Sequence, residues 1–163
     1  MNADSMLDEE VWDRLTSIIM AAHGLDREEF LALVRSFAEQ LKLPSHQRAG
    51  LYLWFVLRNA LAGKVGGREP TDAELADISR DYAERFSVVV DADRPTLEDT
   101  FRKVFERAPL KKEVGPGDLL VLAAAAIGVL YNDPGSALSR IKPGLSSWWQ
   151  EYAEKFHSQG LLR

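Results

Sequence analysis

Residues Asp118–Tyr131 read D-L-L-V-L-A-A-A-A-I-G-V-L-Y, and the thirteen residues after Asp118 carry no charge. Leucine and alanine are strong helix formers and weak strand formers, so the stretch predicts a helix. A helix that is apolar on every face must be covered by other elements, which predicts a central helix with further helices packed around it. The apolar run is too short for a membrane-spanning helix, which needs about 20 residues.

Turn-forming residues flank this stretch on both sides. Gly115-Pro116-Gly117 should block a helix that arrives from upstream, and Asp118 then stands where it can cap the new helix. Asn132-Asp133-Pro134-Gly135 should end the helix. We therefore expect the central helix to run from Asp118 to Tyr131.

The rest of the chain predicts further helices. Apolar residues recur at helical spacing after a series of capping or turn patterns: Ser5–Asp8, Asp26, Pro44-Ser45, Thr71–Glu74 and Pro95-Thr96. His23-Gly24-Leu25 predicts a helix end with Gly24 in the left-handed conformation. The third helix should span about His46 to Ala62, and the glycine-rich stretch Gly63–Pro70 is the clearest linker. A short helix at Ser136–Ile141 and a longer one at Ser146–Gln159 should follow the central helix.

These segments predict one all-α domain over residues 1–163, a helical bundle of about seven or eight helices. Sliding the chain by 67 residues also places 7–62 on 74–129, with Gly50 over Gly117 at equivalent helix starts. This register indicates two three-helix repeats, followed by a C-terminal helical segment over 134–163. Because any two amphipathic helices share apolar stripes, an unrepeated bundle remains the alternative.

Composition narrows the class of protein. The chain has 163 residues, of which 46% are hydrophobic and 28% charged, as in a single soluble domain. Its net charge of −5 and its scattered basic residues argue against nucleic acid or a membrane surface as partner. The absence of cysteine excludes disulfides, thiolate metal sites and a cysteine nucleophile. Met1–Glu10 is acidic, unlike a signal peptide, so we expect a cytoplasmic protein.

The sequence predicts no catalytic residues, no metal site and no cofactor. It has neither a glycine-rich phosphate loop nor a G-x-S-x-G motif, and its three histidines are far apart. Glu154–His157 has the E-x-x-H spacing of carboxylate-bridged metal bundles, but no second copy accompanies it. We interpret these residues as an exposed helix face. An enzyme of unrecognised class is therefore the third of three functional readings.

Three residues are candidates for ligand binding, because they interrupt or flank an apolar helix. Arg58 and Asn59 follow Trp54 in the third predicted helix, where buried polar groups must find partners or line a cavity. A pocket between the two halves, near these residues and the small side chains Ala123–Ala126, would suit a small molecule. The simpler interpretation is that Arg58 extends to the rim of the bundle.

The C-terminal segment carries aromatic residues at helical spacing. Leu145, Trp148, Tyr152 and Phe156 define one stripe, and Trp149 lies about 100° away from Trp148. We expect Trp148 to be buried and Trp149 to lie at the edge. The candidate interface residues are therefore Trp149, Tyr152 and Phe156, since aromatic residues dominate protein interfaces.

The leading function is a non-enzymatic protein-interaction or regulatory module that self-associates as a homodimer or binds a protein partner. The alternative is a small-molecule-binding bundle. An exposed apolar patch would favour the first function, and an elongated cavity the second.

Overall fold

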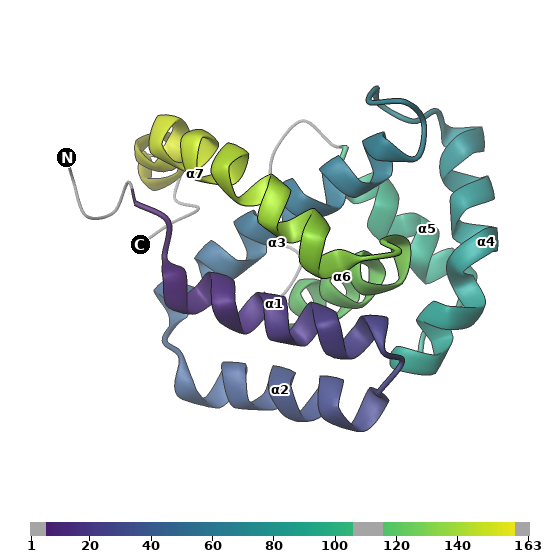
Figure 1. The fold of residues 1–163 in the computed structure, drawn as a ribbon, viewed down its shortest axis with the longest axis horizontal. Coiled ribbons are helices and arrows are strands. Elements are labelled where there is room, and N and C mark those ends of the chain that lie inside the picture. Colours follow the sequence, from purple (N-terminus) through teal and green to yellow (C-terminus); the bar gives the residue numbers. More distant parts are fainter. Residues whose placement is uncertain (1–5, 106–115, 159–163) are drawn as a thin grey trace.

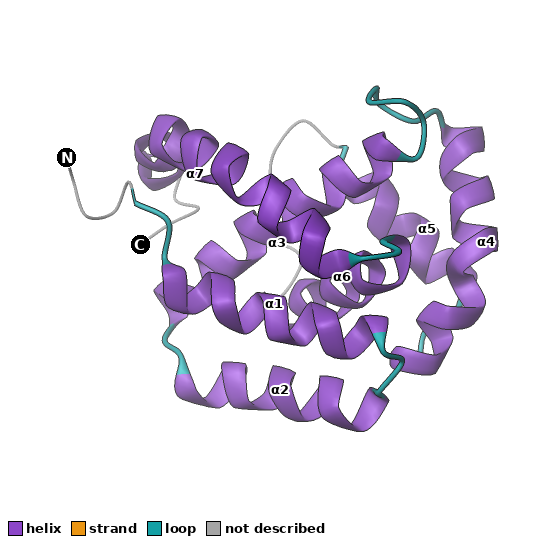
Figure 2. Ribbon diagram, in the orientation of Figure 1, coloured by secondary structure: helices purple, strands orange, loops and turns teal. Residues whose placement is uncertain are grey.

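The computed structural model describes residues 6–105 and 116–158, apart from the side chains of residues 116–119 and 157. These residues form seven helices and no strand, which confirms the predicted all-α bundle. In chain order the helices are α1 (Glu9–His23), α2 (Arg27–Gln40), α3 (Leu43–Gly63), α4 (Asp72–Val89), α5 (Arg94–Lys103), α6 (Pro116–Leu130) and α7 (Pro134–Ser158). Figure 2 shows the loops that join them.

The apolar stretch forms α6, which lies in the middle of the bundle (Figure 1). It packs most extensively against α1 and α3, and it also contacts α2, α4 and α5. Ala123–Ala126, Ile127 and Leu130 are completely buried. The surrounding helices thus explain why α6 has no polar face. Across the described residues no single helix has the length and apolarity to cross a bilayer. Leu120–Leu130 and Pro134–Phe156 meet these two criteria only when they are taken together, and this pair is bent by 116°.

Acidic and hydroxyl side chains cap five of the described helices by accepting backbone hydrogen bonds. The cap residues are Asp8 for α1, Asp26 for α2, Thr71 for α4, Asp93 for α5 and Asp133 for α7. At α4 the predicted capping box is complete, because Glu74 also accepts a hydrogen bond from Thr71 N at 3.0 Å. The cap of α1 is Asp8 rather than Ser5, which lies outside the described residues.

Three helix boundaries differ from prediction. Gly24 is right-handed (φ −71°), whereas Leu25 takes the left-handed conformation (φ 55°) and its N–H donates to Ala22 O at 3.0 Å. The third helix begins at Leu43 instead of His46, and α6 begins at Pro116 instead of after Asp118. Proline is favoured in the first helical turn because the N–H that it lacks has no partner there.

The C-terminal segment is one helix, α7, and not the predicted two. Pro143 lies inside it, although proline removes a helix hydrogen bond and usually kinks or ends a helix. Leu138 and Leu145 are buried on either side of Pro143. The helix packs against α1 and α3, so tertiary contacts before and after the proline hold both parts in place.

The proposed duplication stays a prediction. The paired helices α1 and α2 lie side by side, as do α4 and α5, and all four contact α6 (Figure 1). In a repeat, the contact of α1 with α6 would correspond to the contact of α4 with α3. However, α1 packs on α6 far more extensively than α4 packs on α3. Gly50 also lies well inside α3, whereas Gly117 is in the first turn of α6, so the expected equivalence of helix starts is wrong.

Candidate interaction site

Aromatic side chains from three parts of the chain meet along one side of α3. We define the aromatic patch as five partly exposed residues: Trp54 and Phe55 of α3, Phe105 just after α5, and Trp148 and Tyr152 of α7. Helix α7 packs against α3, and α5 also contacts α3, so tertiary packing alone brings these distant residues together.

Trp148 lies at the centre of the patch. Its ring stacks on Trp54 with centroids 5.7 Å apart and an interplanar angle of 21°. It also contacts Phe55 at 5.0 Å and Tyr152 at 6.2 Å, both in tilted arrangements. These separations are within the range of favourable aromatic pairs, each worth about 0.5–1.5 kcal/mol beyond the area buried. Four of the five rings of the patch therefore form one connected set.

The other tryptophan of α7 lies beneath the patch, so the expected order of burial is wrong. Trp149 is completely buried and packs edge-on against Tyr52 with centroids 4.9 Å apart, whereas Trp148 remains partly exposed. The buried face of α7 carries Leu145, Trp149, Ala153 and Phe156, all at 5% exposure or less. The face is rotated from the predicted stripe because α1 and α3 flank α7 on that side.

This rotation changes the candidate interface. Trp149 and Phe156 contribute to the core and present little or no side-chain surface to a second molecule. Tyr152 is the one predicted interface residue that is partly exposed. The sequence predicts no interface role for Phe55, Phe105 or Trp148, because only the packing of α3, α5 and α7 makes them neighbours.

Arg58 lies against the patch and has no ion-pair partner among the residues that the structure describes. Its guanidinium carbon is 5.2 Å from the ring centroid of Trp54 and 5.2 Å from that of Phe105, so both rings attract the cation. The indole Nε1 of Trp54 is buried and has no hydrogen-bond partner. Two neighbouring donors thus lack acceptors.

The third ligand candidate, Asn59, is exposed and already hydrogen-bonded. Its Nδ2 donates to the backbone oxygen of Phe55 at 2.8 Å. The alanines that were expected to line a pocket opposite Trp54, Ala123–Ala126, are completely buried in the bundle. Trp54 and Arg58 are therefore close together as predicted, but they lie at a partly exposed face beside α7.

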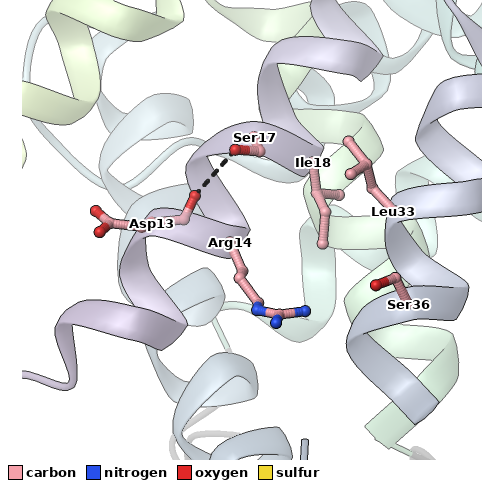
Figure 3. Close-up of a pocket in the computed structure, with 6 residues that line it drawn as sticks. All are labelled: Asp13, Arg14, Ser17, Ile18, Leu33 and Ser36. Atoms are coloured by element: carbon pink, nitrogen blue, oxygen red, sulfur yellow. Dashed lines mark hydrogen bonds between the residues drawn. The ribbon is translucent and has the colours of Figure 1, made fainter. Parts of the chain in front are cut away.

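A separate cavity of about 250 Å³ opens between α1 and α2 (Figure 3). It is lined by Asp13, Arg14, Ser17, Ile18, Leu33 and Ser36. Arg14 already donates to Gln40 Oε1 at 2.8 Å, and the hydroxyl of Ser17 donates to the backbone oxygen of Asp13 at 3.2 Å. Its lining includes no histidine or cysteine.

The described residues also hold no cluster of three histidine, aspartate or glutamate side chains that would bind a metal ion. The side chain of His157, from the E-x-x-H spacing, lies outside the described residues. Comparisons of this chain with protein families, curated proteins and solved structures found no match. The aromatic patch with Arg58 is therefore the candidate functional site on its chemistry alone.

Proposed function

We propose that this protein is a non-enzymatic interaction module that binds a protein partner through the aromatic patch. The observation that carries the proposal is the set of partly exposed rings around Trp148, with Arg58 beside them and unpaired among the described residues. Tryptophan, tyrosine and arginine are the residues that most often dominate the binding energy of an interface. A partner that covers these rings would remove apolar surface from water, at about 25 cal/mol per Å².

Features of the site favour a partner segment over the other readings. The patch spans α3, α5 and α7, which gives it the extent of a surface rather than of an enclosed pocket. Self-association through Trp149 and Phe156 loses its basis, because both are buried within one chain. A second copy would have to use Trp148 and Tyr152 instead, and the experiment below includes that outcome.

A random peptide library displayed on phage tests the proposal without a known partner. The full chain is the bait, and bound peptides are remeasured in solution against wild type and Trp148→Ala. We expect Trp148→Ala to weaken binding at least about tenfold, because loss of a central interface tryptophan commonly costs about 2 kcal/mol or more. Val88→Ala is the control, since Val88 is 46% exposed on α4 and should have no effect.

The variant must remain folded for this comparison, so its helical content is measured by circular dichroism. Tyr152→Ala is a second variant at the edge of the patch if Trp148→Ala unfolds. Failure to select any peptide, or peptides indifferent to both variants, would refute the proposal. Sedimentation of the wild type is measured in parallel, and a dimer that dissociates in Trp148→Ala would replace the foreign partner by a second copy.

A further inference from the structure

We infer that the partner segment carries a carboxylate beside a bulky apolar side chain, and that Arg58 is the residue that recognises it. This inference rests on the proposed function and adds the chemistry of the partner. Arg58 is the site's unused polar group: it is partly buried against two rings, and no described acidic residue neutralises it. An arginine guanidinium offers five donors in a planar fork that matches a carboxylate.

The local geometry preorganises Arg58 for this role. Trp54 and Arg58 stand one turn apart on α3, and the guanidinium lies over the Trp54 ring. Phe105 contacts the same guanidinium from the end of α5. Because rings on two elements contact the cation, its position is restricted before a partner arrives, which lowers the entropy lost on binding. A guanidinium held over a ring face can still offer its in-plane N–H donors to a carboxylate.

Trp54 supplies a second, independent observation. Its Nε1–H is buried without an acceptor, and a buried donor in that state is destabilising. The same arginine side chain lies against this indole. A carboxylate that pairs with Arg58 would therefore lie beside a buried indole N–H that lacks an acceptor.

The charge near the patch agrees with an acidic partner. Lys155 of α7 lies with its Nζ 5.5 Å from the ring centroid of Tyr152, another member of the patch. Neither cation has an ion-pair partner among the described residues. The whole chain carries a net charge of −5, so these cations stand out locally against an acidic molecule. An acidic residue in the partner would be attracted to these two cations.

A double-mutant cycle on the selected peptides tests the inference. The strongest peptide that depends on Trp148 is resynthesised with each aspartate or glutamate changed to the corresponding amide. We expect one such change to raise the dissociation constant about tenfold, and Arg58→Gln to do the same. Combined, the two changes should cost no more than either alone, because they remove the same contact. Binding of the unchanged peptide should also weaken as salt is added.

Matched variants separate recognition from structure. Arg102→Gln is the control, because Arg102 pairs with Glu98 at 3.4 Å on the surface of α5 and should leave binding unchanged. Arg58→Lys keeps the charge but not the planar fork, so we expect binding intermediate between wild type and Arg58→Gln. The indole N–H signals of Trp54 and Trp148 in ¹⁵N NMR spectra should shift on binding and so place the peptide on the patch.

The outcomes distinguish the two proposals. The role of Arg58 would be overturned if the peptides that depend on Trp148 contain no acidic residue. It would also be overturned if the losses of affinity caused by Arg58→Gln and by the amide substitution in the peptide add independently. Either result would leave the interaction module intact. Peptides indifferent to Trp148 would overturn both. If Arg58→Gln unfolds the chain, the Arg58→Lys variant and the salt dependence still test the role of Arg58. Peptide binding that changes neither with Arg58→Lys nor with added salt would contradict a charge-assisted contact.

Discussion

At Gly128, α6 comes so close to α1 that no side chain fits between them. A Cβ atom at this position would lie 2.6 Å from the Cβ of Ala22, 2.7 Å from the backbone oxygen of Ile19 and 2.9 Å from the backbone N of His23. His23 Nδ1 also lies 3.1 Å from the backbone oxygen of Gly128. The glycine that is unfavourable in an isolated helix therefore determines the closest contact between the central helix and its neighbour.

Gly128→Ala should destabilise the protein by about 1–3 kcal/mol, because two of the three clashing atoms belong to the backbone and cannot move aside cheaply. The gain in helix propensity, about 1 kcal/mol, offsets only part of this cost. Gly144→Ala in α7 is the matched control: nothing lies within 4 Å of its Cβ, so it should leave stability unchanged or raise it. Urea unfolding of both variants gives the comparison, and equal stabilities would contradict the close packing.

The buried Tyr52 and the partly buried Tyr131 should make stability fall in alkaline solution. Burial raises the pKa of Tyr52 from 10.0 to about 12, despite the hydrogen bond from Asp8 N at 2.9 Å, and burial also raises the pKa of Tyr131 to about 12. Between pH 10 and 12 the unfolded chain has lost these protons while the folded chain keeps them. The stabilisation is therefore complete below pH 10 and is lost as the pH rises through 12.

Replacing both residues, with Tyr52→Phe and Tyr131→Phe, should reduce this alkaline loss, because phenylalanine has no proton to release. Tyr52→Phe should also cost stability at neutral pH by about 1–3 kcal/mol, since Asp8 N–H loses its acceptor. Denaturant unfolding at a series of pH values separates the two effects. If the double variant loses as much stability as the wild type over the same pH range, the tyrosines do not carry the effect.

Helix α7 shows why an element can be located from sequence while its rotation cannot. The spacing of its aromatic residues predicts a helix, but adjacent Trp148 and Trp149 fit two stripes equally well. The packing of α7 on α1 and α3 selects the stripe with Leu145, Trp149 and Ala153. The same packing overrides the break expected at Pro143.

Trp149→Ala should lower stability by about 3–5 kcal/mol, the usual cost of removing a fully buried aromatic side chain. Trp148→Ala should cost less, because Trp148 is partly exposed and its neighbours remain packed on the core. Thermal melts of the two variants, recorded with helical content at low temperature, measure the difference. A larger loss with Trp148→Ala would mean that α7 is rotated as the sequence alone suggests.

Local signals therefore account for most elements, and long-range packing for the site. Residues close together in sequence predict three of these features: the uncharged run of α6, the capping box at Thr71–Glu74 and the cap at Asp26. Trp54 and Arg58 stand one turn apart on one helix, so their proximity is also local. Phe105 and Trp148 come from elements far along the chain, and only the tertiary fold shows that they complete the patch.

At the scale of the molecule, α6 joins the early and late helices into one core. It contacts α1, α2 and α3 on one hand and α4 and α5 on the other. Without α6, the buried faces of α1 and α3 would lose their largest common neighbour. Each three-helix half thus depends on a helix of the other half, whether or not the halves arose by duplication.

This arrangement predicts a single cooperative unfolding transition for the whole chain. The four tryptophans, Trp12, Trp54, Trp148 and Trp149, lie in α1, α3 and α7, whereas α4 and α5 contain none. Tryptophan fluorescence therefore reports on one part of the bundle and circular dichroism on all helices. In urea the two signals should give the same midpoint and slope, because loss of the α6 core exposes both halves together.

Calorimetry should give an unfolding enthalpy of roughly 110 kcal/mol for 163 residues, at about 0.7 kcal/mol per residue. A dichroism transition that begins before the fluorescence changes would instead mean that α4 and α5 unfold as a separate unit, and that residues 1–163 are not one domain.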